Sequence, residues 1–271
     1  MLRKCRSRKA AASLAAGRRM TYLRTIESMA PPLDHLRVIL VGTRNPLNIG
    51  AAARAMSNFG VRCLRLVHPY EMAFREARSA VGAGKLLAEA EEFATVAEAI
   101  ADCKLVVGTT AAGRRELRHQ LRSLPGGGAI MRRRLAVGNV ALLFGSEKTG
   151  LSNSDLSHCD WLMRIPTRAE HGSMNLGQAV AVCLYELVRT GKKSAAQSRE
   201  AGPTAAELER ITQILFGILE SSGYVKPRLA AATEENLRRL VRRMQLDATD
   251  AEVWQGMLRQ ISWKFAQNST K

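Results

Sequence analysis

Asn45, Asn48 and Arg54 are the first residues of this sequence whose types and spacing could support chemistry. An apolar, β-branched run at residues 38–41 precedes them and is typical of a strand buried in a parallel sheet. Asn48 is expected to cap a short helix that ends at Gly60. Two amides, a cation and a helix N-terminus would then meet at the carboxyl end of a strand. Open α/β sheets bind ligands there, and a helix N-terminus favours an anion such as phosphate.

Arg54 lies off the apolar face of this predicted helix. The simpler interpretation is a solvated surface arginine, and the alternative is a cation that contacts a ligand beside the two asparagines. At about 100° per residue, the apolar face is shared by Ala51, Ala52, Ala55, Met56 and Phe59.

The elements that must position these residues alternate between apolar runs and helical patterns. Strands are predicted at residues 64–67, 104–107, 139–145 and 162–166, and one or two helices within residues 85–100. Ser173 or Asn175 is expected to cap a helix that continues to Leu187. This alternation predicts an α/β fold with a mostly parallel sheet flanked by helices.

Three stretches carry a resemblance to a known family: NPLNIGAAARA at residues 45–55, LLFGSEKTGLS at 142–152 and RIPTRAEHGSMNLGQAVAVCLYEL at 164–187. In this order they resemble the three motifs of the SPOUT superfamily, in its SpoU (TrmH-like) branch of RNA ribose 2′-O-methyltransferases. The resemblance covers residues 37–188. It implies a C-terminal trefoil knot, S-adenosyl-L-methionine as cofactor, and a homodimer whose sites are shared across the subunits.

The resemblance also implies catalytic roles. Arg54 is assigned the key role, either as a general base or, because guanidinium resists deprotonation, as a group that stabilises the alkoxide or orients a phosphate. Asn45 and Asn48 are candidates for holding ribose or phosphate, with shaping of the loop as the alternative. Ser173 and Asn175 could bind the substrate as well as the cofactor.

By position in the family, the cofactor is expected at the loops that follow the strands. In one such loop, Thr109 and Thr110 are candidates for cofactor contact. The alternative is that their hydroxyl groups only stabilise the loop. A glycine in another suggests a close approach of backbone to ligand, and a nearby glutamate is expected to tie down its own turn. The implied cofactor-binding residues are Thr109, Thr110, Ala111, Gly145, Glu147, Ile165, Ser173, Met174 and Asn175.

Composition points to an anionic partner. The 271-residue chain has a formal net charge of +17 and a pI near 10.4. RNA is favoured over a membrane surface, because no apolar run approaches the roughly 18 residues that would span a bilayer. Arginines gather in a glycine-rich zone after residue 113, where a solvated face is the alternative to RNA contact. The RNA-binding candidates are Arg44, Arg114, Arg115, Arg118 and Arg122.

Five scattered cysteines show no metal-ligand spacing. We therefore expect ordinary thiols in a cytoplasmic protein, and no metal site.

The chain divides into four parts by composition. Residues 1–33 form a basic arm, interpreted as disordered or as the product of an upstream start codon. Residues 34–190 form the SPOUT domain, 191–203 a linker, and 204–271 a small helical extension. Thr204 with Glu207, Thr233, and Thr249 with Glu252 are expected to cap its helices.

The extension resembles the tail of the TrmJ group, which methylates the ribose of tRNA anticodon-loop position 32, a cytidine or uridine. Four arginines of the extension could grip tRNA or form a solvated helix face: Arg238, Arg239, Arg242 and Arg243.

Three other functions are weighed against tRNA methylation. The same chemistry on ribosomal RNA is one, and a catalytically inactive RNA-binding SPOUT protein is another. A dinucleotide-dependent dehydrogenase fits poorly, because no G-x-G-x-x-G sequence follows a strand.

Overall fold

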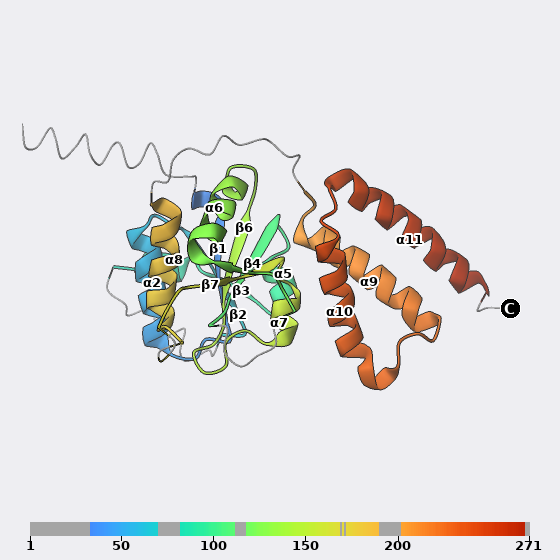
Figure 1. Ribbon diagram of the computed structural model, residues 1–271, viewed down its shortest axis with the longest axis horizontal. Coiled ribbons are helices and arrows are strands. Elements are labelled where there is room, and N and C mark those ends of the chain that lie inside the picture. Colours follow the sequence, from blue (N-terminus) through green and yellow to red (C-terminus); the bar gives the residue numbers. More distant parts are fainter. Residues whose placement is uncertain are drawn as a thin grey trace, which may run out of the picture.

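The computed structural model describes residues 33–69, 82–111, 118–168, 170, 172–189 and 202–268 (Figure 1). Its centre is a sheet with the strand order β3-β2-β1-β6-β4-β7-β5. All strand pairs are parallel and the central strands are apolar, as expected for a sheet buried on both faces. This confirms the predicted α/β class. The strands are β1 (Leu36–Val41), β2 (Cys63–Val67), β3 (Glu91–Phe93), β4 (Leu105–Thr109), β5 (Leu121–Ser123), β6 (Val140–Phe144) and β7 (Trp161–Arg164).

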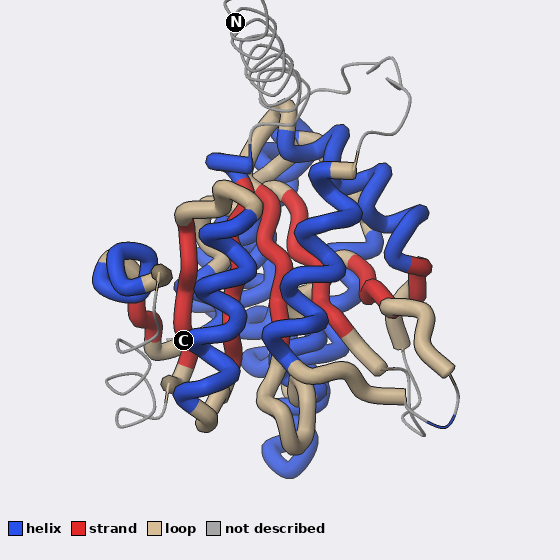
Figure 2. The backbone as a smooth tube through the Cα atoms, turned by 90° about the vertical axis from the view of Figure 1, so that its left-hand side faces the viewer, coloured by secondary structure: helices blue, strands red, loops and turns tan. Residues whose placement is uncertain are grey.

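Helices cover both faces of the sheet, and each face has its own apolar core. On one face α2 (Pro46–Asn58) and α8 (Leu176–Val188) lie side by side across the strands (Figure 2). α4 (Gly84–Ala88) and α6 (Leu124–Leu135) pack into the same core. α5 (Val96–Ala99) and α7 (Asn153–Ser157) cover the other face. A short 3-10 turn, η1 (Leu33–His35), precedes β1.

Helix α2 begins earlier than predicted. Asn45, not Asn48, is the N-cap, because its side-chain oxygen accepts a hydrogen bond from the backbone N–H of Leu47 at 2.9 Å. Pro46 suits the first helical position, where a backbone N–H would have no partner within the helix. The prediction for Asn48 was wrong, and its side chain turns out to serve another contact. Gly60, with a φ of +74°, follows the helix end as predicted.

Several elements were not anticipated from the sequence, among them β3, β5 and α6. Strand β3 lies within the region predicted to be helical, and its three mostly charged residues give no alternating pattern. Helix α6 contains a run of three glycines. A Cβ on Gly127 would lie 2.9 Å from the Trp161 ring, and one on Gly128 would lie 2.9 Å from the Glu186 side chain. Close packing against β7 and α8 therefore compensates for the poor helix propensity of glycine.

Further helices follow the α/β part: α9 (Ala205–Ser221), α10 (Ala230–Arg243) and α11 (Ala248–Asn268), with the 3-10 turn η3 (Pro227–Leu229) between the first two. Ile211, Val241 and Leu258 form their common core. Ala205 at the start of α9 packs into the core of the α/β part, and its N–H donates to Cys103 O at 2.8 Å. The first of these helices is thus anchored to the sheet layer.

One of the three caps predicted for these helices is confirmed. Thr204 and Glu207 form the capping box of α9. Thr233 lies inside α10, and Thr249 lies inside α11. At the start of α11 the side chain of Asp247 accepts a hydrogen bond from the backbone N–H of Asp250 instead. Both remaining predictions therefore placed the start of the helix too late.

Two of the arginines on α10 are buried, so both interpretations given for them from the sequence were wrong. Arg238 and Arg242 are each only 6% exposed. Arg238 donates to Glu209 and to Ser157, whereas Arg242 donates to Asp160 at 3.2 Å. The reason is that α10 packs against α7, which the sequence pattern of α10 alone does not reveal (Figure 1).

Several predictions concern segments outside the described residues. These are the N-terminal arm up to residue 32, residues 191–201 of the linker, and Arg114 and Arg115. Among the described helices, none is both long and apolar enough to cross a membrane.

Candidate active site

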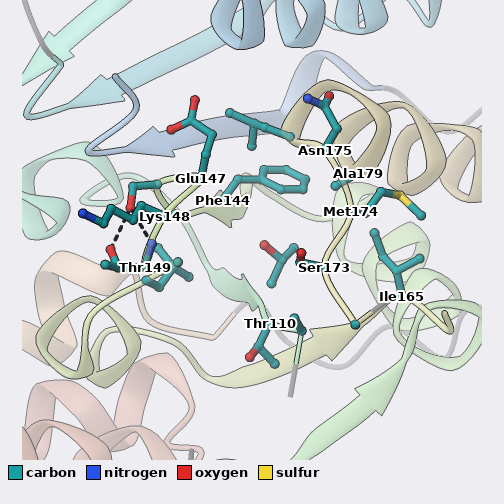
Figure 3. A pocket seen from close by; sticks show the side chains of 18 of the residues that line it. Thr110, Phe144, Glu147, Lys148, Thr149, Ile165, Ser173, Met174, Asn175 and Ala179 are labelled. Carbon is teal, nitrogen blue, oxygen red and sulfur yellow. Dashed lines mark hydrogen bonds between the residues drawn. The ribbon is translucent and has the colours of Figure 1, made fainter. Parts of the chain in front are cut away.

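The carboxyl ends of β4, β6 and β7 and the start of α8 surround a cavity of about 540 Å³. Such a volume is typical of small-molecule sites. In Figure 3 Phe144, Thr110 and Ser173 face the middle of this cavity, with Ile165 and Met174 at one side. The fold brings all nine predicted cofactor-binding residues to its wall: Thr109, Thr110, Ala111, Gly145, Glu147, Ile165, Ser173, Met174 and Asn175.

A chain of hydrogen bonds joins the three sequence motifs at the cavity rim. Asn175 Nδ2 donates to Asn48 Oδ1 at 2.8 Å, and Asn48 Nδ2 donates to Glu147 Oε1 at 2.9 Å. Asn175 also caps α8, because its side-chain oxygen accepts from the N–H groups of Gly177 and Gln178. Glu147 therefore ties down its turn, as expected, through a contact with Asn48 of helix α2.

The turn after β6 is closed by its own polar groups. Ser146 and Thr149 share a hydrogen bond of 2.7 Å between their hydroxyl oxygens, and Gly150 N donates to Ser146 O at 2.8 Å. A Cβ on Gly145 would lie only 2.1 Å from the Gly150 carbonyl carbon and from Leu151 N. The structure thus gives a different reason for this glycine from the predicted ligand contact: the turn folds back on its own backbone.

The loop after β4 is held by hydrogen bonds to both neighbouring strands. Thr109 Oγ1 donates to Leu143 O at 2.8 Å, and Thr110 N donates to Met163 O at 3.0 Å. Thr109 therefore has the structural role weighed as the alternative, although it also borders the cavity.

A second, more open cavity of about 1020 Å³ adjoins the first on the side of α2. Arg44 and Asn45 line it, and Asn48 and Glu147 border both cavities. Four predicted site residues thus lie at the boundary where a large substrate could approach the small cavity.

Arg54 stands apart from this assembly. It is exposed on α2 and is not among the residues that line either cavity. It lies on the outer side of α2, on the same face as Leu47, because residues seven positions apart fall on one side of a helix. Leu47 is 78% exposed. One copy of the chain therefore does not place Arg54 beside its own cavity.

Sequence reasoning missed several residues of the cavity wall. Phe144, Lys148, Thr149 and Leu151 all line it. Each belongs to the motif at residues 142–152, so extending the site to every residue of that motif would have found them. Figure 3 shows Lys148 and Thr149 together at one side of the cavity.

The described thiols are placed for packing. Cys103, Cys159 and Cys183 are buried, and burial raises the pKa of the Cys183 thiol to about 12. Among the described residues there is no cluster of three potential metal ligands.

Similarity to known proteins covers the residues that form these cavities. The sequence model of the SpoU rRNA Methylase family matches residues 35–185, which is more than half of the chain and includes both cavity walls. The chain belongs to the SpoU methylase family. The resemblance found in its three motifs is thereby confirmed.

Several tRNA methyltransferases are similar to this chain over a longer range than the family model. The tRNA (cytidine/uridine/adenosine-2′-O-)-methyltransferase TrmJ of Pseudomonas aeruginosa (strain UCBPP-PA14) is 35% identical over 239 residues, 83% of this chain and 93% of the relative. TrmJ of Yersinia pestis (strain Pestoides F), a tRNA (cytidine/uridine-2′-O-)-methyltransferase, is 33% identical over 248 residues, 88% of this chain and 96% of the relative. The crystal structure of TrmJ from Z. mobilis ZM4 has a TM-score of 0.73 at 31% identity, and the match covers 83% of this chain and 98% of that one.

Proposed function

We propose that this chain transfers a methyl group from S-adenosylmethionine to a ribose 2′-hydroxyl of tRNA. The observation that carries the proposal is the hydrogen-bonded chain from Asn175 through Asn48 to Glu147, which joins the three family motifs at one cavity. Relatives that share about a third of the sequence are tRNA 2′-O-methyltransferases. The net charge of +17 suits a polyanionic substrate.

The chemistry of the cavity wall fits the proposed cofactor. Phe144, Leu151 and Ile165 offer apolar surface to an adenine ring, and Ser173 offers a hydroxyl group for a polar contact. Glu147 adds a carboxylate at the rim, which favours a cationic sulfonium. When bound there, S-adenosylmethionine supplies an electrophilic methyl group.

The residues of the chain must orient the ribose hydroxyl and remove its proton. Asn48 lies at the boundary of the two cavities, so it can hold a ribose hydroxyl or phosphate while fixed by Glu147 and Asn175. Arg44 and Asn45 would receive the neighbouring backbone of the RNA in the second cavity. Ser173 borders the first cavity near the same boundary and is assigned to substrate or cofactor.

Arg54 is assigned the catalytic role at the cavity of a second copy. Its position away from both cavities of its own chain supports this assignment. The outer faces of α2 and α8 expose apolar side chains, Leu47 at 78% and Tyr185 at 56%, as a homodimer interface would require. In such a dimer Arg54 would stabilise the developing alkoxide or orient the phosphate that accepts the proton, since guanidinium itself resists deprotonation.

The finer features of the family are part of this proposal. We infer a trefoil knot within residues 142–188 and a methyltransferase domain of residues 34–190. The knot is supported by membership of the family, since the motifs of this segment resemble those of the knotted SPOUT enzymes. A linker at 191–203 would lead to a tRNA-specific extension at 204–271. Arg118 and Arg122 are assigned to RNA, and the substrate is assigned as position 32 of the anticodon loop in cytoplasmic tRNA.

The test is methyl transfer from labelled S-adenosylmethionine to unmodified total tRNA and to ribosomal RNA, followed by nucleoside mapping. Label in a 2′-O-methyl cytidine or uridine of the anticodon loop is the expected result. Label confined to ribosomal RNA would replace the substrate and keep the chemistry. Cofactor binding without any transfer would leave an RNA-binding protein of this fold.

A further inference from the structure

Arginines from two distant parts of the chain converge at the seam between the sheet and α10. Arg118 Nη1 donates to Asn236 Oδ1 at 3.1 Å, and Arg239 Nη2 donates to the same oxygen at 2.8 Å. A single neutral amide oxygen thus holds two guanidinium groups close to each other. Like charges at such a distance repel, so the arrangement is costly unless an anion joins them.

The surroundings compensate only part of this charge. Glu235 lies 3.6 Å from Arg239, and Asp160 lies 3.2 Å from Arg242. The four arginines of this cluster therefore lie beside these two carboxylates. The pKa of Arg239 is lowered by its burial and by the charge of Arg118, although Glu235 opposes this effect. The seam cluster consists of Arg118, Arg239, Arg242 and Arg243.

Several nitrogen atoms of the seam have no acceptor among the described residues. They are His119 Nε2, and Nε and Nη2 of Arg242. Burial and the charges of Arg239 and Arg243 lower the pKa of His119, which therefore stays neutral and can share a proton with an incoming oxygen. Buried donors without acceptors are rare in proteins, and an anion with several oxygens would satisfy them.

We infer that Arg118 and Arg239 together bind one phosphate of the RNA backbone, so that the α/β part and the helical extension contact the same RNA strand. This inference rests on the proposed function and adds the place where the extension meets the substrate. Arginine suits the task because its planar fork contacts phosphate oxygens in pairs. Arg243, which is exposed at the end of α10, would contact the flanking backbone.

The experiment measures the affinity of the full chain for tRNA at several salt concentrations, with Arg118→Gln, Arg239→Gln and the double variant. For each phosphate contact, the logarithm of the affinity falls with the logarithm of salt by about 0.7–0.9. If both arginines hold one phosphate, each single variant weakens binding about threefold to tenfold. In the double variant, the slope of log affinity against log salt should then decrease by the amount expected for one phosphate contact, not two.

Arg259→Gln on α11 is the matched control, because this exposed arginine lies on a helix that packs against α9 and not in the seam. Its tRNA affinity should equal that of the wild type. Arg239→Lys keeps the charge and should restore most of the salt slope, which a variant that had merely lost its fold would not do.

Two results would overturn the inference. Unchanged tRNA affinity in the double variant would show that the seam serves something else, such as an acidic protein segment. A loss of slope twice that of either single variant would show two separate phosphates. If the seam variants bind tRNA more weakly but the wild type transfers no methyl group, the proposed function is refuted instead. If the wild type transfers methyl groups but the seam variants bind tRNA normally, only the inference is refuted.

Discussion

Replacing Arg238 should destabilise the protein more than any surface charge change, and the structure allows the size to be worked out. The side chain is 7% exposed and makes two hydrogen bonds to the Glu209 carboxylate, at 2.8 and 2.9 Å. Nη2 also donates to Glu234 at 2.6 Å and Nη1 donates to Ser157 at 3.1 Å. Arg238→Met therefore leaves Glu209 partly buried without its counter-charge, the case in which a broken ion pair is most costly.

The pKa of Glu209 sets the scale. Burial raises this pKa, but the hydrogen bonds and charge of Arg238, together with a hydrogen bond from Gln213, outweigh burial and lower it from 4.5 to about 2. Because each pKa unit is worth about 1.4 kcal/mol, the net shift corresponds to about 3 kcal/mol, to which Arg238 contributes the largest favourable part. A carboxylate with a lowered folded-state pKa stabilises the fold above its unfolded value. The contribution is thus present above pH 4.5 and is lost as the pH falls toward 2.

The assay is urea unfolding of wild type and Arg238→Met at pH 7 and again near pH 3. We expect a difference in unfolding free energy of about 3 kcal/mol at pH 7 that shrinks at the lower pH. Lys85→Ala is the control, since Lys85 and Glu89 are 87% and 58% exposed and lie 3.8 Å apart. Its cost should stay below about 0.5 kcal/mol. A difference for Arg238→Met below about 1 kcal/mol, or one that does not change with pH, would refute the reasoning.

Three further predictions follow from the site and the sheet. Arg54→Ala should abolish methyl transfer while equilibrium dialysis shows nearly unchanged cofactor affinity; near-wild-type turnover would remove the residue from the mechanism. Gly145→Ala should weaken cofactor binding at least about tenfold, because its Cβ would lie 2.1 Å from backbone atoms. Gly84→Ala is the control, because its Cβ would meet nothing within 4 Å, and this variant should bind the cofactor normally. Equal cofactor affinities for Gly145→Ala and Gly84→Ala would contradict the packing argument. Asp102→Asn should cost about 1 kcal/mol at pH 7, a value reduced for its 40% exposed side chain. Burial raises the pKa of Asp102, but Arg65 lowers it to about 2, so this loss should vanish as the pH falls from 3.8 toward 2; a constant loss would argue against the ion pair.

The α/β class and the cofactor wall could be predicted from the sequence because their signals are local. Apolar runs marked the central strands. Thr204 was predicted as a cap, and Asn175 was one of two cap candidates, because a cap bonds to the next turn of its own helix. The cavity residues follow strand ends, and parallel strands bring their carboxyl ends to one edge. Residues close to one another in sequence thus carried enough information.

Other features depended on which surfaces meet in three dimensions. The glycines of α6 form a helix because Trp161 and Glu186 fill the space that side chains would need. Asn48 bonds to Glu147 and Asn175, residues far away in the sequence, and not to its own helix. Arg238 and Arg242 have the sequence context of surface residues, yet packing of α10 on α7 buries them against Glu209 and Asp160.

The sequence by itself determined the central apolar strands, the motif residues and the sign of the charge. Tertiary structure decided which of the arginines face solvent, which form buried ion pairs and which gather on Asn236 at the seam. The physical reason is that the burial of a charge depends on the surface packed against it, and neither composition nor helical periodicity carries that information.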